Sequence, residues 1–243
     1  MKVLGLDIGG TGIKGALVDT ESGHMLTERF RLLTPHPATP KAMIATTAEI
    51  VDHFNWHGPV GCGFPSAIKQ GVVLTAANVS KKWIGFNLEE ALQTLTGCDV
   101  VVLNDADAAG LAEMRFGAGR DQEGVVLIVT LGTGIGISLF VRGQLVPNLE
   151  LGHIEIGGLD ADDWASGITR ELENLSWKNW GKRVNKYLVT MEHLLWPDLI
   201  IIGGGVSKKH EKFFPYLTTQ TPVVPAKMRN QAGIVGAALA AVV

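Results

Sequence analysis

The chain is poor in cysteine and has no excess of basic residues, and each shortage excludes a class of protein. Its 243 residues include 2 cysteines, Cys62 and Cys98. Two cysteines are too few for a disulfide framework or a cysteine-based zinc site, and they fit a reducing, cytoplasmic environment. The formal net charge of −3 excludes the bulk basic surface that drives nonspecific nucleic-acid binding. We therefore expect no nucleic-acid partner.

Apolar runs suited to a membrane are also missing. Asp7 interrupts the short apolar start, so no signal peptide is expected. The longest uncharged stretch, 124–141, has glycines and threonines in its middle, which favours buried strands over a membrane span. A composition of 46% hydrophobic and 19% charged residues is that of a globular protein with one or two domains. We expect a cytoplasmic protein with no membrane partner.

The chain does contain a glycine-turn pattern that occurs twice. The segment VLGLDIGGTG at 3–12 has the same shape as VLIVTLGTG at 126–134, so that Gly9 aligns with Gly132 and Asp7 with Thr130. Each copy predicts a strand, a tight turn and a second strand. An ordinary hairpin is one interpretation. A phosphate-binding turn is the other, because glycine amides and threonine hydroxyls together form an anion-binding concavity. The repetition indicates a duplicated unit and favours the second interpretation.

A third glycine segment follows a buried strand near the end of the chain. IIIGGGVS at 200–207 predicts a close approach of backbone to a ligand or an ordinary strand-to-helix turn. Strands precede helices in both halves, which predicts an α/β fold. We expect an N-terminal domain at 1–109 and a C-terminal domain at 110–243, with the helix at about 230–243 packing back on the first.

Asn104 and Asp105 directly follow the expected strand 100–103 and precede a helix. Ligands of α/β sheets gather beyond the carboxyl ends of strands, so Asp105 could act as a general base with Asn104 as a paired donor and acceptor. Both residue types also favour the N-cap of a helix, and the pattern leaves the two roles equal. Asp107 is the rival carboxylate, although an acid in a first helical turn simply complements the dipole.

Glu150 and His153 stand three apart in an expected loop after the second glycine unit. In a turn they are close enough to contact one small polar ligand. Metal binding is disfavoured, because no third and fourth ligands follow at suitable spacing.

Five motifs together resemble a known family. They occur in this order: DIGGT at 7–11, NDADAA at 104–109, LGTGIG at 131–136, ELGH at 150–153 and GGGV at 203–206. They resemble the repressor, open reading frame and kinase (ROK) family of sugar kinases, within the sugar kinase–actin superfamily. The short length and the segments ANVSKKW, VPNLE and TPVVPAK, at 77–83, 146–150 and 221–227, are most similar to the polyphosphate glucokinases of that family.

The resemblance implies duplicated ribonuclease H-like (actin/hexokinase-like) domains with the active site in the cleft between them. It also implies transfer of a terminal phosphoryl group from polyphosphate, or also from ATP, to the 6-hydroxyl of glucose, with Asp105 as the base. The implied glucose contacts are Asn78, Asn104, Asp105, Glu150 and His153. The implied phosphate and nucleotide contacts are Asp7, Gly9, Gly10, Thr11, Gly12, Lys14, Gly132, Thr133, Gly134, Gly203, Gly204 and Gly205.

The chain departs from the family pattern in two places. The cysteine-rich zinc motif that many relatives carry after the Gly-His pair is absent, so no zinc is expected and His153 is released from metal ligation. The family's later sugar-binding Glu corresponds to Asp162, in ADDWAS at 161–166, and Glu155 is a candidate substitute. The expected cofactor is Mg²⁺, for which Asp7 is a possible contact through water.

Three alternatives remain open. The donor could be strictly ATP, because glycine turns recognise phosphates rather than a base, and the sugar could be glucose, mannose or glucosamine. A sugar-sensing regulator is disfavoured, because such relatives carry a DNA-binding domain ahead of the first turn, which here starts within the first ten residues. The family suggests a homodimer, with the region of Trp177, Trp180 and Trp196 as a candidate interface.

Overall fold

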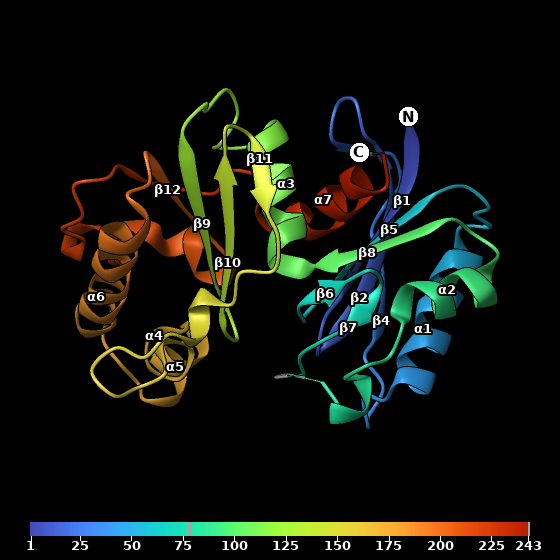
Figure 1. Cartoon of the computed structure of the whole chain (residues 1–243), viewed down its shortest axis with the longest axis horizontal. Helices are drawn as coiled ribbons and strands as arrows, with labels where there is room; N and C mark the ends of the chain where they lie inside the picture. The colour runs from blue at the N-terminus through green and yellow to red at the C-terminus, as the bar shows by residue number, and fades with distance from the viewer. Residues whose placement is uncertain (77–78, 243) are drawn as a thin grey trace. The chain divides into compact units, whose positions relative to one another are not determined.

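The computed structural model describes residues 1–76 and 79–242, which divide into two compact units (Figure 1). Unit 1 comprises Met1–Ala112 and Gln231–Val243, and unit 2 comprises Glu113–Asn230. The helix α3 (Asp105–Phe116) runs from one unit into the other, and α7 (Ala232–Ala240) brings the end of the chain back to unit 1.

Unit 1 is built on a sheet with the strand order β3-β2-β1-β5-β8, in which β4 also pairs with β2. The strands β1, β5 and β8 are parallel, whereas β1 and β2 form an antiparallel hairpin. The helices α1 and α2 lie on one side of this sheet and α7 on the other (Figure 1). Its remaining elements are β1 (Lys2–Ile8), β2 (Gly12–Asp19), β3 (His24–Met25), β4 (Phe30–Leu33), α1 (Pro40–His53), β5 (Val60–Phe64), β6 (Ile68–Lys69), β7 (Val72–Val73), η1 (Lys81–Trp83), α2 (Leu88–Thr96) and β8 (Val100–Asn104).

The helix α7 packs unusually close to the sheet of unit 1, and glycines make this possible. A Cβ on Gly61 of β5 would meet the carbonyl of Ala237, and one on Gly236 would meet the carbonyl of Ala108 in α3. The apolar sequence AGIVGAALA therefore forms a helix buried between a strand and another helix rather than an amphipathic surface helix.

Unit 2 repeats the scheme with a sheet of order β11-β10-β9-β12-β13. The strands β9 and β10 form an antiparallel hairpin, and β12 runs parallel to both β9 and β13. Its elements are β9 (Val125–Leu131), β10 (Ile135–Val141), β11 (Gln144–Val146), η2 (Leu151–His153), α4 (Ala161–Ala165), α5 (Gly167–Leu172), α6 (Trp177–Leu195), β12 (Leu199–Gly203), η3 (Gly205–Lys212), η4 (Phe214–Tyr216), β13 (Val223–Pro225) and η5 (Arg229–Gln231).

The core of unit 2 contains one of the tryptophans expected at a subunit interface. Trp180 of α6 is fully buried and its indole N–H lies 2.9 Å from the carbonyl oxygen of Ser166. It belongs with Tyr187 to a core cluster that also contains residues of the strands β9 and β12. Trp180 is thus a core residue, and that part of the interface hypothesis is wrong. Trp196 is 68% exposed.

No helix within residues 1–76 and 79–242 is both long and apolar enough to cross a bilayer. The longest uncharged stretch, 124–141, forms the hairpin of β9 and β10.

Candidate active site

Both glycine turns are hairpin turns, as their patterns predict. In unit 1 the register ends at the pair Ile8 and Ile13, and the N–H of Gly9 donates to the carbonyl of Gly12 at 3.1 Å. In unit 2 it ends at the pair Leu131 and Ile135. The second turn is therefore one residue shorter than the first. This difference breaks the alignment of the two copies after their glycines.

Two side chains contact the first turn from outside, one on β4 and one directly after it. The hydroxyl of Thr34 donates to the carbonyl of Gly9 at 2.6 Å, and Arg31 donates to the carbonyl of Thr11 at 3.2 Å. Arg31 lies so close to Gly12 that a Cβ at this glycine would meet its guanidinium. Within the part of the chain that the structure describes, the N–H groups of Gly10 and Thr11 have no hydrogen-bond partner. The turn thus keeps two amide donors for an anion.

Asp7 and Lys14 face each other across the hairpin that carries this turn. The two residues are register partners, and the Lys14 ammonium lies 2.9 Å from the Asp7 carboxylate. Both side chains are largely shielded from solvent, and Gly233 of α7 leaves room for the carboxylate. Lys14 thus stands close to the turn as a positive charge, and it also competes with any cation for Asp7.

Asn104 and Asp105 lie at the same edge of the sheet of unit 1 as Asp7. The register aligns Asp7 with Gly63 on β5 and Gly63 with Leu103 on β8, so the chain beyond these points leaves the sheet at one edge. This is where α/β proteins bind ligands.

Asn104 caps α3 with its side chain. Its amide oxygen accepts from the N–H groups of Ala106 and Asp107 at 2.8 and 3.1 Å, and its amide nitrogen donates to the carbonyl of Ser66 at 3.1 Å. The N-cap interpretation is therefore correct for Asn104, and one amide hydrogen remains for a ligand. Asp105 is the first residue of α3, and Asn78 lies outside the described residues.

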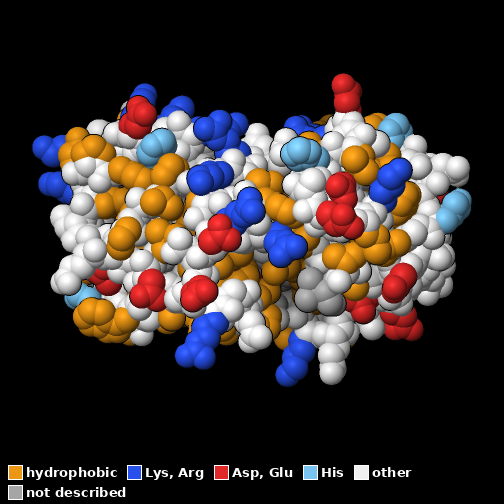
Figure 2. Space-filling view, turned by 90° about the horizontal axis from the view of Figure 1, so that it is seen from above, with side chains coloured by type: hydrophobic (Ala, Val, Ile, Leu, Met, Phe, Trp, Pro, Cys, Tyr) orange, Lys and Arg blue, Asp and Glu red, His pale blue; other side chains and the backbone are white. Residues whose placement is uncertain are grey.

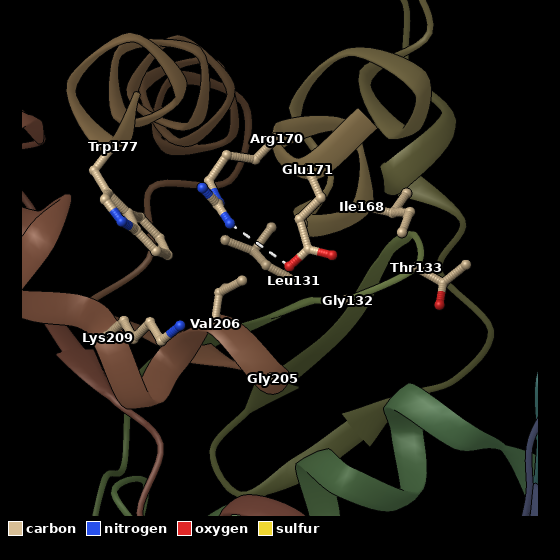
Figure 3. A pocket seen from close by; sticks show the side chains of 11 residues that line it. Leu131, Gly132, Thr133, Ile168, Arg170, Glu171, Trp177, Gly205, Val206 and Lys209 are labelled. Atoms are coloured by element: carbon tan, nitrogen blue, oxygen red, sulfur yellow. Dashed lines mark ion pairs between the residues drawn. The ribbon is translucent and has the colours of Figure 1, made fainter. Parts of the chain in front are cut away.

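The second glycine turn and the third glycine segment come together in unit 2. The register pairs Thr130 on β9 with Gly203 on β12, which brings Gly132 and Gly205 to one cavity of about 330 Å³ (Figure 3). Gly204 has a φ of +79°, and a Cβ there would meet the backbone of Leu131, so only glycine fits.

Three of the predicted sugar contacts form a second cluster in unit 2. Glu150 precedes η2, His153 ends it, and Asp162 stands in the first turn of α4. The Asp162 carboxylate accepts from the N–H of Ile135 and lies against Gly134, so it touches the second glycine turn. Glu155, the candidate substitute, is exposed and bridges to Asp160 by its backbone.

Asp160 is a member of this cluster that the motif pattern missed. Its carboxylate lies 3.1 Å from Nδ1 of His153 and also accepts from the N–H of Asp162 at 2.9 Å. This second hydrogen bond caps α4. In the sequence, the only feature that could have pointed to Asp160 is that Asp is a preferred N-cap residue, two positions before Asp162. Asp160 therefore orients the imidazole of His153.

The charges of the cluster act on each other. Desolvation raises the pKa of Glu150. The charge of His153 acts against this shift, and the charge of Asp162 adds to it. Desolvation likewise raises the pKa of Asp162, against the hydrogen bond from Ile135. Desolvation would lower the pKa of His153, but the hydrogen bond and charge of Asp160 raise it above its usual value. The cluster is thus a polar site with carboxylates as acceptors and an imidazole that readily carries a proton.

A preformed metal cage is not found among the described residues, where no three His, Cys, Asp or Glu side chains form a group suited to a metal. Mg²⁺ usually keeps several waters and is held by one or two carboxylates together with substrate phosphates. Asp7 beside the first turn fits that pattern only as a single, water-mediated contact, because Lys14 occupies one of its oxygens.

Comparison with known proteins agrees with this geometry. The ROK family profile matches residues 3–163. The chain is 49% identical over 239 residues to the polyphosphate glucokinase of Mycobacterium tuberculosis (strain CDC 1551 / Oshkosh), covering 98% of this chain and 90% of that protein.

Solved structures give the same result. The inorganic polyphosphate/ATP-glucomannokinase of Arthrobacter sp. strain KM superposes with a TM-score of 0.94 at 48% identity, covering 98% of this chain and 97% of that one. A ROK family glucokinase from Streptomyces griseus, in complex with glucose and AMPPNP, superposes with a TM-score of 0.83 at 26% identity, covering 98% of both chains.

The chain belongs to the ROK family. The predicted actin/hexokinase-like α/β fold is confirmed. Within this family, the chain is similar over nearly its whole length to sugar kinases named for polyphosphate as the donor.

Proposed function

We propose that the protein is a polyphosphate-dependent glucokinase, which transfers the terminal phosphoryl group of inorganic polyphosphate to the 6-hydroxyl of glucose. The observation that carries this proposal is 49% identity across 98% of the chain to a polyphosphate glucokinase. A second donor and sugar, ATP and mannose, are supported by the similarity to a polyphosphate/ATP-glucomannokinase.

In the proposed reaction Asp105 accepts the proton of the glucose 6-hydroxyl as its oxygen forms a bond to the terminal phosphorus. The bond from that phosphorus to the bridging oxygen breaks, and the shortened polyphosphate leaves. Stabilising such a transition state depends mainly on positioning the reactants and neutralising the phosphate charge. The amides of Gly10 and Thr11, the turn at Gly132–Gly134 and the Lys14 ammonium supply donors and positive charge.

The glucose contacts are proposed on the family resemblance, residue by residue. Glu150, His153 and Asp162 form one cluster, and Asn104 offers one amide hydrogen. Asn78 is proposed as a further contact on the family resemblance alone. Mg²⁺, when bound to the donor, would neutralise phosphate charge, with Asp7 as its water-mediated contact.

The test is the exchange of Asp105 for asparagine. A general base contributes about 10²–10⁴-fold, so D105N should lose roughly this factor in kcat with polyphosphate. The cap from Asn104 stays in place, so the thermal unfolding midpoint should change little. D52N on the exposed side of α1 is the matched control. If D105N retains more than about a tenth of wild-type turnover, Asp105 is not the base.

We also propose a cytoplasmic homodimer, as the family resemblance suggests. Trp196 and Leu194, at the end of α6, are 68% and 62% exposed and give an apolar patch for a second copy. Sedimentation equilibrium of wild type and of W196S should show a dimer that the variant weakens.

A further inference from the structure

Three cationic side chains surround one indole ring in unit 2. The guanidinium carbon of Arg170 lies 4.2 Å from the Trp177 ring centroid, and the ammonium groups of Lys209 and Lys212 lie at 5.9 and 5.8 Å. Within residues 1–76 and 79–242, the only carboxylate paired with this group is Glu171, which is 3.6 Å from Arg170 and mostly exposed. The group therefore has an excess of positive charge in a chain whose net charge is −3.

Arg170, Lys209 and the Trp177 ring line the cavity at the second glycine turn, and Lys212 adds a positive charge at the same ring. Figure 3 shows Arg170 from α5, Trp177 from α6 and Lys209 from η3 pointing into the space bordered by Gly132 and Gly205. Figure 2 shows further Lys and Arg side chains on the face seen from above, with acidic side chains among them. The cavity thus adds a local basic site directly beside a turn proposed to bind donor phosphate.

The arrangement is unsatisfied without an anion. Like charges gathered at one ring repel each other, and the cation–π attraction offsets this only in part. The Nε of Arg170 is buried and has no hydrogen-bond partner among the described residues. A buried donor without a partner costs free energy, which a phosphate oxygen would recover.

The same arrangement disfavours a nucleobase. The guanidinium of Arg170 lies over the Trp177 ring, where a base would otherwise stack. An adenine ring carries no charge to neutralise the lysines, whereas each phosphate of a polyphosphate chain does.

We infer that this cavity binds the inner phosphates of inorganic polyphosphate, behind the phosphoryl group that is transferred, through Arg170 and Lys209, with Lys212 at the Trp177 ring as a further positive charge for the chain of phosphates. The inference rests on the proposed function and names the part of the chain that distinguishes polyphosphate from ATP. Trp177 positions the cations, and the glycine turns bind the phosphates next to the reacting one.

The experiment compares K209Q, K212Q and the double variant with wild type, with K182Q on the exposed side of α6 as the charge-matched control. Donor KM is measured at saturating glucose for long-chain polyphosphate, tripolyphosphate and ATP. Losing one charge-assisted phosphate contact costs about tenfold in affinity. The double variant should therefore raise KM for long-chain polyphosphate by about 30–100-fold, and KM for ATP by much less. K182Q should match wild type.

The inference is overturned if KM for long-chain polyphosphate stays within about twofold of wild type in the double variant, or if KM for ATP rises as much. A second readout separates this from a failure of the proposed function. Binding of polyphosphate without glucose is followed by quenching of tryptophan fluorescence. If wild type binds polyphosphate but does not turn it over, the proposed function is wrong. The cavity assignment is still supported in that case if the double variant binds polyphosphate about tenfold more weakly than wild type. If both bind equally or neither binds, the cavity assignment is wrong.

Discussion

The contact between Gly134 and Asp162 allows a sharp test of how the second turn is held. A Cβ on Gly134 would meet the carboxylate of Asp162, and the same carboxylate accepts from the N–H of Ile135. The proposed sugar cluster and the proposed phosphate turn are thus joined through one carboxylate. We predict that changes at these two positions are strongly non-additive.

The expected magnitudes follow from the contacts. D162A removes a charged acceptor from the N–H of Ile135, which costs about 1.5–3 kcal/mol in the free energy of unfolding. Desolvation of the half-buried carboxylate offsets part of this, so we expect about 1–2 kcal/mol. D162N keeps an acceptor oxygen and should cost less than about 1 kcal/mol. G134A forces the carboxylate away and should cost about 1–3 kcal/mol.

In the double variant G134A/D162A the overlapping carboxylate is gone. Its cost should therefore fall below the sum of the single variants by about 1 kcal/mol or more. Urea unfolding followed by tryptophan fluorescence measures all four proteins. Additivity within about 0.3 kcal/mol would refute the contact. In kinetic assays D162N should change KM for glucose more than KM for the donor, and the reverse result would remove Asp162 from the sugar site.

Two further predictions concern His153 and α7. D160N should lower the pKa of His153, seen by NMR titration of the imidazole, because Asp160 raises it in the folded state. Since the folded pKa lies above the unfolded value, protonated His153 stabilises the fold below about pH 6.5. This contribution is lost as pH rises through the folded pKa, and an unchanged pKa in D160N would contradict the pairing. G61A should lower the unfolding midpoint, because its Cβ meets the carbonyl of Ala237; overpacking of this kind costs about 1–3 kcal/mol, and calorimetry with no shift would contradict it.

Local patterns were sufficient for most of the elements. Thr39 followed by Pro40 is a typical helix start, and the structure has Thr39 as the N-cap and Pro40 in the first turn of α1. The apolar runs on either side of each glycine turn predicted the two hairpins, since strand pairing there depends on neighbours in sequence. Very short strands such as β6 and β13 escaped prediction, because two or three residues carry no periodicity.

The candidate site was predictable only where a residue type already implied a role. Asn104 and Asp105 follow a strand, so their place at a sheet edge could be foreseen. Arg31 and Asp160 could not be found this way, because each acts through a partner that folding brings near: the carbonyl of Thr11 and the imidazole of His153. Trp177 and Trp180 look alike in sequence, yet one lines a cavity and the other fills a core.

The sequence alone determined the family, the duplicated α/β scheme and the two glycine turns, because these depend on residue types at fixed spacing. The residue types already distinguish the two turns, since Asp7 precedes the first and Thr130 stands at the matching place before the second. Tertiary structure decided which other groups surround each turn. The first turn is held by side chains from the strand β4 and just beyond it and stands beside the Asp7–Lys14 pair. The second adjoins a cavity lined by Arg170 and Lys209. Such differences arise from groups distant along the chain, whose positions depend on packing rather than on local preference.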